Sequence, residues 1–171
     1  MSVTVTVENI EKASAQFWEQ MLAMRLEPIF DTLGAAETIR CIGTGHVVGS
    51  CNLSGVWVGR IEVRLSSGLA IEATSAMLMQ PAESVLPADT LDATKEIANM
   101  IAGTIKSALP RPCSMTVPSA EVESADFCIV PHTSDSVTVF FRHESGELMV
   151  RVWQQLGEPE VRNEGLSLVS A

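Results

Sequence analysis

The amino-acid sequence predicts an α+β fold in which helices pack against an antiparallel sheet. Three segments repeat apolar residues at the helical period, and two separate regions alternate apolar and polar residues as strands do. Their order is helix, strands, helix, then helix and strands, which suggests two pseudo-repeated halves that each open with a helix and close with antiparallel strands. A chain of 171 residues can bury a core, and we expect one domain over residues 1–171.

The first half opens with an amphipathic helix over residues 8–23, where apolar residues follow helical spacing. Residues 25–30 then look extended. Residues 37–65 are rich in Val, Ile and Gly, and their alternation predicts two or three antiparallel strands joined by glycine turns. Ser67 is expected to cap a second helix over residues 67–79, which a proline follows closely.

The second half begins after a proline-containing loop over residues 81–90. A third helix is predicted at about residues 89–109, because two prolines stop it and Asp92 lies near its positive end. The turn Ser145-Gly146 separates the last two strands. The predicted strands are 114–117, 125–130, 137–143 and 147–155. The tail over residues 157–171 has little pattern, as is typical of a partly mobile segment.

Charge and hydropathy limit the classes of molecule that this protein is expected to bind. Asp and Glu number 21 against 11 Lys and Arg, which gives a net charge of −10 and disfavours nucleic-acid binding. Polar residues interrupt every apolar stretch well before the roughly 18 residues of a membrane span, and the N-terminus lacks the pattern of a secretory signal. We therefore expect a soluble protein whose partner is another protein or a small molecule.

The cysteines form no CxxC pair, and their spacing does not suit a zinc or redox motif. Without a secretory signal, the simplest interpretation is a reduced, cytoplasmic protein in which they act as small buried apolar residues. They are Cys41, Cys51, Cys113 and Cys128.

Other short motifs are explained better by a structural role than by a catalytic or ligand-binding role. The glycine-rich segment over residues 43–49 resembles a dinucleotide-binding loop, but that chemistry needs a helix directly after the glycines, and the sequence continues in a strand-like pattern. We interpret these glycines as part of a hairpin. His46, His132 and His143 lack metal-ligand spacing, and no activated nucleophile is evident, so no metal or cofactor site is predicted. Three tryptophans are interpreted as packing residues: Trp18, Trp57 and Trp153.

The third helix has two distinct faces at about 100° per residue. The core side is predicted to hold Ala93, Ile97, Ile101, Ile105 and Ala108, with Met100 and Thr104 beside them. The opposite, exposed side holds Asp92, Glu96, Asn99, Gly103 and Lys106. Any amphipathic helix has a polar face, but a helical glycine costs about 1 kcal/mol relative to alanine, and asparagine roughly half of that. A surface that admits another protein's backbone closely is one reason to keep Gly103.

The spacing Asp92-xxx-Glu96-xx-Asn99, continued by Met-Ile-Ala-Gly103, resembles the signature helix of the CheC, CheX and FliY family of chemotaxis phosphatases, and CheX most closely. Residues 53–63, 69–78 and 146–153 also resemble strands and a helix of that family. The resemblance covers about residues 8–156. It implies a single CheX-like domain that removes the phosphoryl group from the aspartyl phosphate of a CheY-type response regulator.

The resemblance also implies roles for these side chains. Asn99 would hold the attacking water, and Glu96 would contact the lysine of the regulator's active site. The regulator would supply Mg²⁺ and the phosphorylated aspartate, so no cofactor is expected in this chain. Asp92, Gly103 and Lys106 are the remaining candidates for partner contact. A homodimer with one site per chain is implied, because Glu19 is followed three residues later by Leu22 and not by a second asparagine.

One departure from the family pattern concerns the loop after the third helix. The family signature has a proline where this chain has Val122, and the nearest proline is Pro118. Two other functions stay open at this stage. One is a non-catalytic module of the same fold that binds a response regulator or serves in a flagellar switch. The other is a small-molecule-binding α+β domain, which would need a deep pocket away from the third helix.

Overall fold

In the computed structural model, residues 5–29, 40–42, 45–129, 132–133 and 135–155 are described. The tail over residues 157–171 lies outside these ranges. None of the helices within them is long and apolar enough to cross a membrane. The helices are α1 (Val7–Leu22), α2 (Ser67–Leu78), the short 3-10 helix η1 (Ala82–Ser84) and α3 (Pro87–Ser107).

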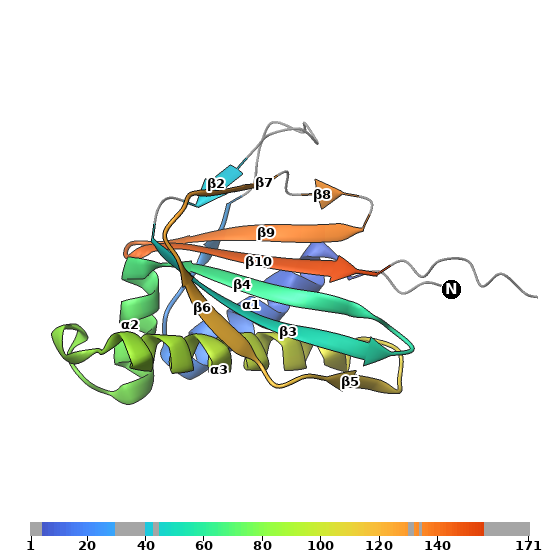
Figure 1. Ribbon diagram of the computed structural model, residues 1–171, viewed down its shortest axis with the longest axis horizontal. Coiled ribbons are helices and arrows are strands. Elements are labelled where there is room, and N and C mark those ends of the chain that lie inside the picture. Colours follow the sequence, from blue (N-terminus) through green and yellow to red (C-terminus); the bar gives the residue numbers. More distant parts are fainter. Residues whose placement is uncertain (1–4, 30–39, 43–44, 130–131, 134, 156–171) are drawn as a thin grey trace, which may run out of the picture.

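The main sheet is antiparallel throughout, with the strand order β1-β9-β10-β4-β3-β5, while β6 also pairs with β3 and β8 with β9. A separate two-stranded sheet joins β2 and β7. Figure 1 shows α3 running along the β3 side of the main sheet, with α2 at one end. The predicted fold class is therefore confirmed. The strands are β1 (Glu27–Pro28), β2 (Arg40–Ile42), β3 (His46–Gly55), β4 (Gly59–Ser66), β5 (Cys113–Met115), β6 (Ser119–Glu123), β7 (Phe127–Ile129), β8 (His132–Thr133), β9 (Ser136–His143) and β10 (Gly146–Gln154).

The central strand β4 is buried on both of its faces. Ile61, Val63 and Leu65 belong to the apolar core that the sheet forms with α1, α2 and α3. Because strand side chains alternate between faces, Glu62 and Arg64 lie on the opposite side, where they are also buried. The sheet therefore has an apolar face under the helices and a polar, buried patch on its other face.

The tryptophan interpretation holds for two of the three residues. Trp18 and Trp57 are fully buried in the apolar core. Trp153 is half-buried, and the guanidinium of Arg151 lies 4.1 Å from the centre of its ring. That contact is a cation–π interaction at the end of β10.

Helix α1 begins one residue before the prediction, because Thr6 caps it. The hydroxyl of Thr6 accepts a hydrogen bond from the backbone N–H of Asn9 at 3.2 Å, and the Asn9 side chain accepts one from the Thr6 N–H at 3.0 Å. This reciprocal pair satisfies backbone donors that the first helical turn leaves free. The helix ends where Ala23 adopts a left-handed conformation with φ of 53°.

The capping prediction for α2 is wrong by one residue. Ser66 is the N-cap position and Ser67 is the first helical residue. The hydroxyl of Ser67 donates to the carbonyl of Gly45, and the hydroxyl of Ser66 accepts from the N–H of Glu147 at 3.0 Å. These serines therefore tie the start of α2 to neighbouring segments, which local sequence does not reveal.

The glycine-rich segment continues into a strand, because its residues 46–49 are the first residues of β3. The strand-like pattern predicted this, and the helix N-terminus that a phosphate loop needs does not follow these glycines. The hairpin interpretation holds for Gly49, because β3 pairs antiparallel with the next strand, β4, but the turn of that hairpin lies at residues 56–58, after the glycine-rich segment. The predicted turn between the last two strands does connect β9 to β10, but its residues are Glu144 and Ser145, and Gly146, at φ of 149°, begins β10.

Strand β6 was missed in the sequence. Its residues are mostly exposed and do not alternate clearly, because it lies outside β3 at the edge of the sheet. Val122, at the position of the family proline, pairs with Val47 of β3. Pro118 comes immediately before the strand, where a missing N–H does not interrupt the ladder.

The expectation that all four cysteines are reduced is also wrong. Cys51 and Cys113 are free, but Cys128 is disulfide-bonded. Cys128 in β7 pairs with Cys41 in β2 along the backbone. Spacing alone could not predict this, because strand pairing brings together segments that are far apart in sequence. The disulfide removes one argument for a reducing compartment.

Candidate functional site

Helix α3 carries the predicted site, and its start is set by Pro87. Proline suits the first helical position, because its N–H would have no partner there and its φ is already helical. Asp89 accepts a hydrogen bond from the backbone N–H of Leu86 at 3.0 Å, and its charge suits the positive end of the helix. The helix therefore begins two residues before the predicted Asp89, within the segment that was predicted to be a loop.

The inner side of α3 matches the helical wheel, with two exceptions. Its buried residues combine the predicted isoleucines with small residues. Ala108 is exposed, because the helix ends at Ser107 and Ala108 is its C-cap. Met100, which was expected beside the core, is exposed, and Thr104 is partly exposed. The buried residues are Thr90, Ala93, Thr94, Ile97, Ala98, Ile101, Ala102 and Ile105.

A glycine in β3 allows α3 to lie unusually close to the sheet. A Cβ atom at Gly49 would be 2.8 Å from the carbonyl oxygen of Thr94 and 3.0 Å from the Cβ of Ala98. No side chain fits at those distances without moving the helix backbone. The absence of a side chain at Gly49 thus sets the distance between α3 and the sheet at the helical turn that carries Glu96 and Asn99.

The outer side of α3 holds all five residues that the sequence placed there. Asp92 and Glu96 are exposed, whereas Asn99, Gly103 and Lys106 are partly exposed. Glu96 and Asn99 are three positions apart on a continuous helix, so their Cβ atoms are neighbours at roughly 5–6 Å. The structure therefore brings the predicted carboxylate and amide together on one accessible surface.

The side chains of Glu96 and Asn99 are unpaired within the part of the chain that the structure describes. Neither makes a hydrogen bond or an ion pair there. Asp92 differs, because its carboxylate pairs with Lys95 Nζ at 2.9 Å. The amide and carboxylate groups of the central pair are thus available to an incoming molecule, while Asp92 already has a local partner.

Gly103 faces open space. A Cβ atom built at this position would have no atom within 4 Å, apart from the neighbouring helix backbone. Gly103 therefore does not serve close packing within the described fold, although glycine lowers helix stability. Its absence of a side chain leaves clearance on the outer surface one turn beyond Asn99.

One group of residues could offer ligands to a metal ion. Ligand atoms of Glu72, His143 and Glu144 all lie within 4.8 Å of one another. The Nδ1 atom of His143 accepts a hydrogen bond from the Ser145 N–H at 3.2 Å and lies 2.6 Å from the Ser145 hydroxyl. This nitrogen is therefore already in contact with its own turn. The group belongs to α2 and the β9–β10 turn, and it contributes nothing to the α3 surface.

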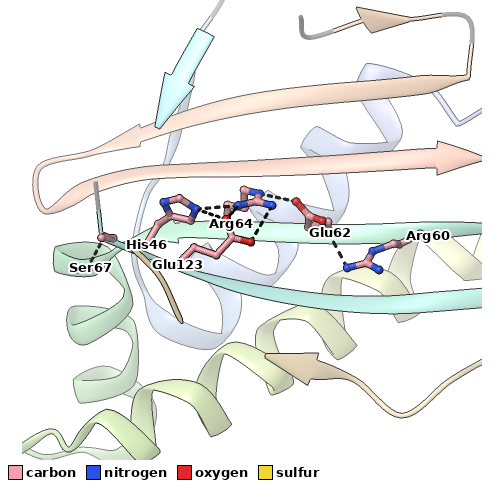
Figure 2. A network of polar contacts seen from close by, with 7 residues as sticks. His46, Arg60, Glu62, Arg64, Ser67 and Glu123 are labelled. Carbon is pink, nitrogen blue, oxygen red and sulfur yellow. Dashed lines mark hydrogen bonds and ion pairs between the residues drawn. The ribbon is translucent and has the colours of Figure 1, made fainter. Parts of the chain in front are cut away.

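A buried polar network lies on the sheet face opposite the helices (Figure 2). The guanidinium of Arg64 bonds to Glu62 and, at 2.6 Å, to Glu123. His46 Nε2 lies 2.8 Å from Arg64 Nη1 and 3.1 Å from Glu123. The network joins β3, β4 and β6. Glu62 and Arg64 are neighbours on β4, but His46 and Glu123 are far from them in sequence, so no local motif predicts the network.

The network affects the ionisation of Glu123. The hydrogen bond from Arg64 holds the pKa of this carboxyl below its ordinary value of 4.5, although burial acts in the opposite direction. The charge of Arg64 and the contact with His46 lower the pKa further. Because Glu123 ends β6, and β6 contacts α3, this ion pair helps to hold the strand beside the candidate site.

The fold and the α3 surface define an α+β protein that presents an accessible Glu–Asn pair on a helix packed against the sheet. The family model for the chemotaxis phosphatase CheX matches residues 47–142, which include β3, β4, α2 and α3. That match covers more than half of the chain, and the chain therefore belongs to the CheX family.

Solved structures agree on the fold. The chemotaxis protein CheX from Vibrio vulnificus is 18% identical with a TM-score of 0.66, covering 87% of this chain and 95% of that one. CheX from Desulfovibrio desulfuricans is 21% identical with a TM-score of 0.66, covering 86% and 97%. CheX in a CheX–CheY–BeF3–Mg²⁺ complex from Borrelia burgdorferi is 16% identical with a TM-score of 0.60, covering 87% and 97%. No curated protein sequence matches the chain.

Proposed function

We propose that this protein binds a CheY-type response regulator and hydrolyses its aspartyl phosphate, using the outer face of α3. The observation that carries the proposal is the accessible pair of Glu96 and Asn99 on α3, without partners among the described residues, in a chain of the CheX family. The class of partner is supported by the solved complex of a CheX with CheY, BeF3 and Mg²⁺.

Asn99 is proposed to position the attacking water. Its amide offers both a hydrogen-bond donor and an acceptor, so it can hold a water in a defined orientation. Phosphoryl transfer passes through a loose transition state and depends mainly on positioning and charge stabilisation. An amide cannot act as a useful general base, and orientation is therefore the contribution that it can make.

Glu96 is proposed to dock against the lysine in the regulator's active site. A free carboxylate accepts a strong, directional hydrogen bond from an ammonium group when the interface closes around both. Because Glu96 precedes Asn99 by three residues, docking through the carboxylate would bring the amide to the same region of the partner. Mg²⁺ is proposed to belong to the regulator, where it neutralises charge on the phosphoryl group.

The other outer residues are proposed to contact the regulator around this pair. Gly103 gives the partner's backbone room to approach, and Lys106 and Asp92 extend the polar surface on either side. A homodimer and a cytoplasmic location also remain proposals. Both rest on the resemblance to CheX and on the proposed regulator partner.

The test uses each CheY-type response regulator of the protein's source organism. Each regulator is phosphorylated with acetyl phosphate and Mg²⁺, and its loss of phosphoryl group is followed with and without the protein. We expect catalytic amounts of the protein to shorten the lifetime of at least one regulator at least tenfold. Binding without any shortening would favour the non-catalytic binding module, and unchanged lifetimes with no binding would contradict both functions.

A further inference from the structure

A groove lies beside the C-terminal end of α3, next to the proposed site. Its volume is about 770 Å³. Gly103 and Lys106 line one side, and residues 111–115, which include β5, line the other. Gly103 follows Asn99 by four residues, so the groove begins about 6 Å along the helix axis from the water-positioning amide. A partner that covers Asn99 would therefore reach this groove.

The groove is basic, although the protein is strongly acidic. Lys106 and Arg111 line it, and no Asp or Glu is among its described lining residues. In the described part of the chain, neither cation has an ion pair. The chain as a whole has a net charge of −10. The described residues therefore leave both cations of this groove available to an acidic group from another molecule.

Helix electrostatics explain only part of this arrangement. Lys106 lies in the last turn of α3, where a cation interacts favourably with the negative end of the helix. Arg111 lies beyond the helix and is exposed, so that explanation does not extend to it. Its guanidinium presents a planar set of donors that matches a carboxylate. The floor nearby includes the partly buried side chains of Cys113 and Met115.

We propose that this groove receives an acidic side chain, Asp or Glu, from the surface of the phosphorylated response regulator, with Lys106 and Arg111 as its partners. This proposal rests on the proposed function and deepens it. Charge complementarity identifies the occupant, because an anionic side chain satisfies both cations and its apolar stem packs on Met115.

The groove also determines the orientation in which the regulator docks along α3. Glu96 and Lys106 are ten residues apart, which corresponds to about 15 Å along α3. A regulator that offers a lysine to Glu96 and a carboxylate to Lys106 and Arg111 fits α3 in one orientation only. The reversed orientation would place like charges together, which is unfavourable.

The test compares two double variants with the same change in charge. Lys106→Glu/Arg111→Glu reverses both groove cations. Lys12→Glu/Arg25→Glu reverses two exposed cations on and just after α1, and neither of them lines the groove. Thermal unfolding establishes that both variants are folded. Dephosphorylation is measured against regulator concentration at low and high salt, and binding is titrated with the regulator saturated with beryllofluoride and Mg²⁺.

For the groove variant we expect about a tenfold rise in KM and in the Kd for the beryllofluoride-loaded regulator, because two attractive contacts become repulsive. The two substitutions should raise KM and leave kcat nearly unchanged. The increase of KM with salt concentration should also be smaller than it is for wild type. The control variant should change KM and Kd less than twofold. An unchanged KM and Kd in the groove variant would overturn the proposal. An equal rise in KM and Kd in the control variant would overturn it as well.

The two proposals fail in different ways. If Asn99→Ala lowers kcat while the groove variant behaves as wild type, only the groove proposal fails. If wild-type protein binds the loaded regulator but never shortens the lifetime of the phosphorylated form, the phosphatase function fails, and the Kd comparison still decides the role of the groove. Absence of any binding to the loaded regulators would overturn both.

Discussion

At position 103, helix stability and the proposed docking favour different residues. Glycine there gains no packing contact within the described fold, since a Cβ atom would face open space. It also lowers the stability of α3 relative to alanine. Glu96 and Asn99 on the same surface lack partners of their own in the described residues. All three features are expected of residues whose contacts form only when another protein arrives.

Gly103→Ala should therefore stabilise the protein and weaken its activity. The added methyl group meets no atom within 4 Å, and the helix should gain about 1 kcal/mol in its free energy of unfolding. The same methyl group would occupy the clearance proposed for the regulator, and KM for dephosphorylation should rise several-fold. Denaturant unfolding and regulator turnover measure the two effects. A more stable variant with unchanged KM would show that Gly103 has no docking role.

At the level of elements, the contact between α3 and β3 holds the outer surface in position. Periodicity predicted the helix and its two faces, because core packing repeats at 3.6 residues per turn. It could not predict the close approach at Gly49 or the start at Pro87, since both depend on neighbours outside the helix. Ala108 was misplaced because the wheel continued beyond the true end of the helix.

Gly49→Ala should destabilise the protein, in contrast to Gly103→Ala. Its methyl group would lie 2.8 Å from the backbone oxygen of Thr94, so α3 must move away from the sheet. We expect a loss of about 1–3 kcal/mol in the free energy of unfolding, as for other overpacked sites. Denaturant unfolding of the two alanine variants side by side makes the comparison. Equal effects of the two substitutions would contradict the proposed packing of α3 on β3.

The ion pair at the end of β6 should make stability depend on pH. The folded pKa of Glu123 lies below the ordinary value of 4.5, so its contribution is present above that value and is lost as the pH falls through the folded pKa. Glu123→Gln should therefore be less stable than wild type at neutral pH, and the difference should vanish in acid. Solvent screens the Arg64–Glu123 ion pair and reduces its contribution to stability, because 35% of the Glu123 side chain is exposed.

The matched control for this prediction is Glu121→Gln. Glu121 lies on the same strand, is exposed, and makes no ion pair within the described residues. Chemical denaturation at several pH values between neutral and acid compares the two variants with wild type. If Glu121→Gln shows the same pH-dependent loss, the effect belongs to overall charge and not to the Arg64–Glu123 pair.

For the whole molecule, the sequence predicted the fold class and the surface of the candidate site better than the topology. The order of elements and the outer residues of α3 follow from local patterns. The separate β2–β7 sheet, the edge strand β6 and the network around Arg64 do not, because they join residues far apart in the chain. The basic groove was missed for a different reason: its described lining residues are close in sequence, from Gly103 to Met115, but the helical pattern does not show that the chain after α3 forms a hollow with the last turns of the helix.

The central claim is that Asn99 positions the water that hydrolyses the regulator's aspartyl phosphate. The most direct measurement compares wild type with Asn99→Ala in single-turnover dephosphorylation, alongside binding to the beryllofluoride-loaded regulator. Gln20→Ala, which removes an exposed amide from α1, is the control. We predict that Asn99→Ala loses at least a hundredfold in rate while its Kd stays within about threefold of wild type. A variant that binds and dephosphorylates the regulator as wild type does would contradict the account.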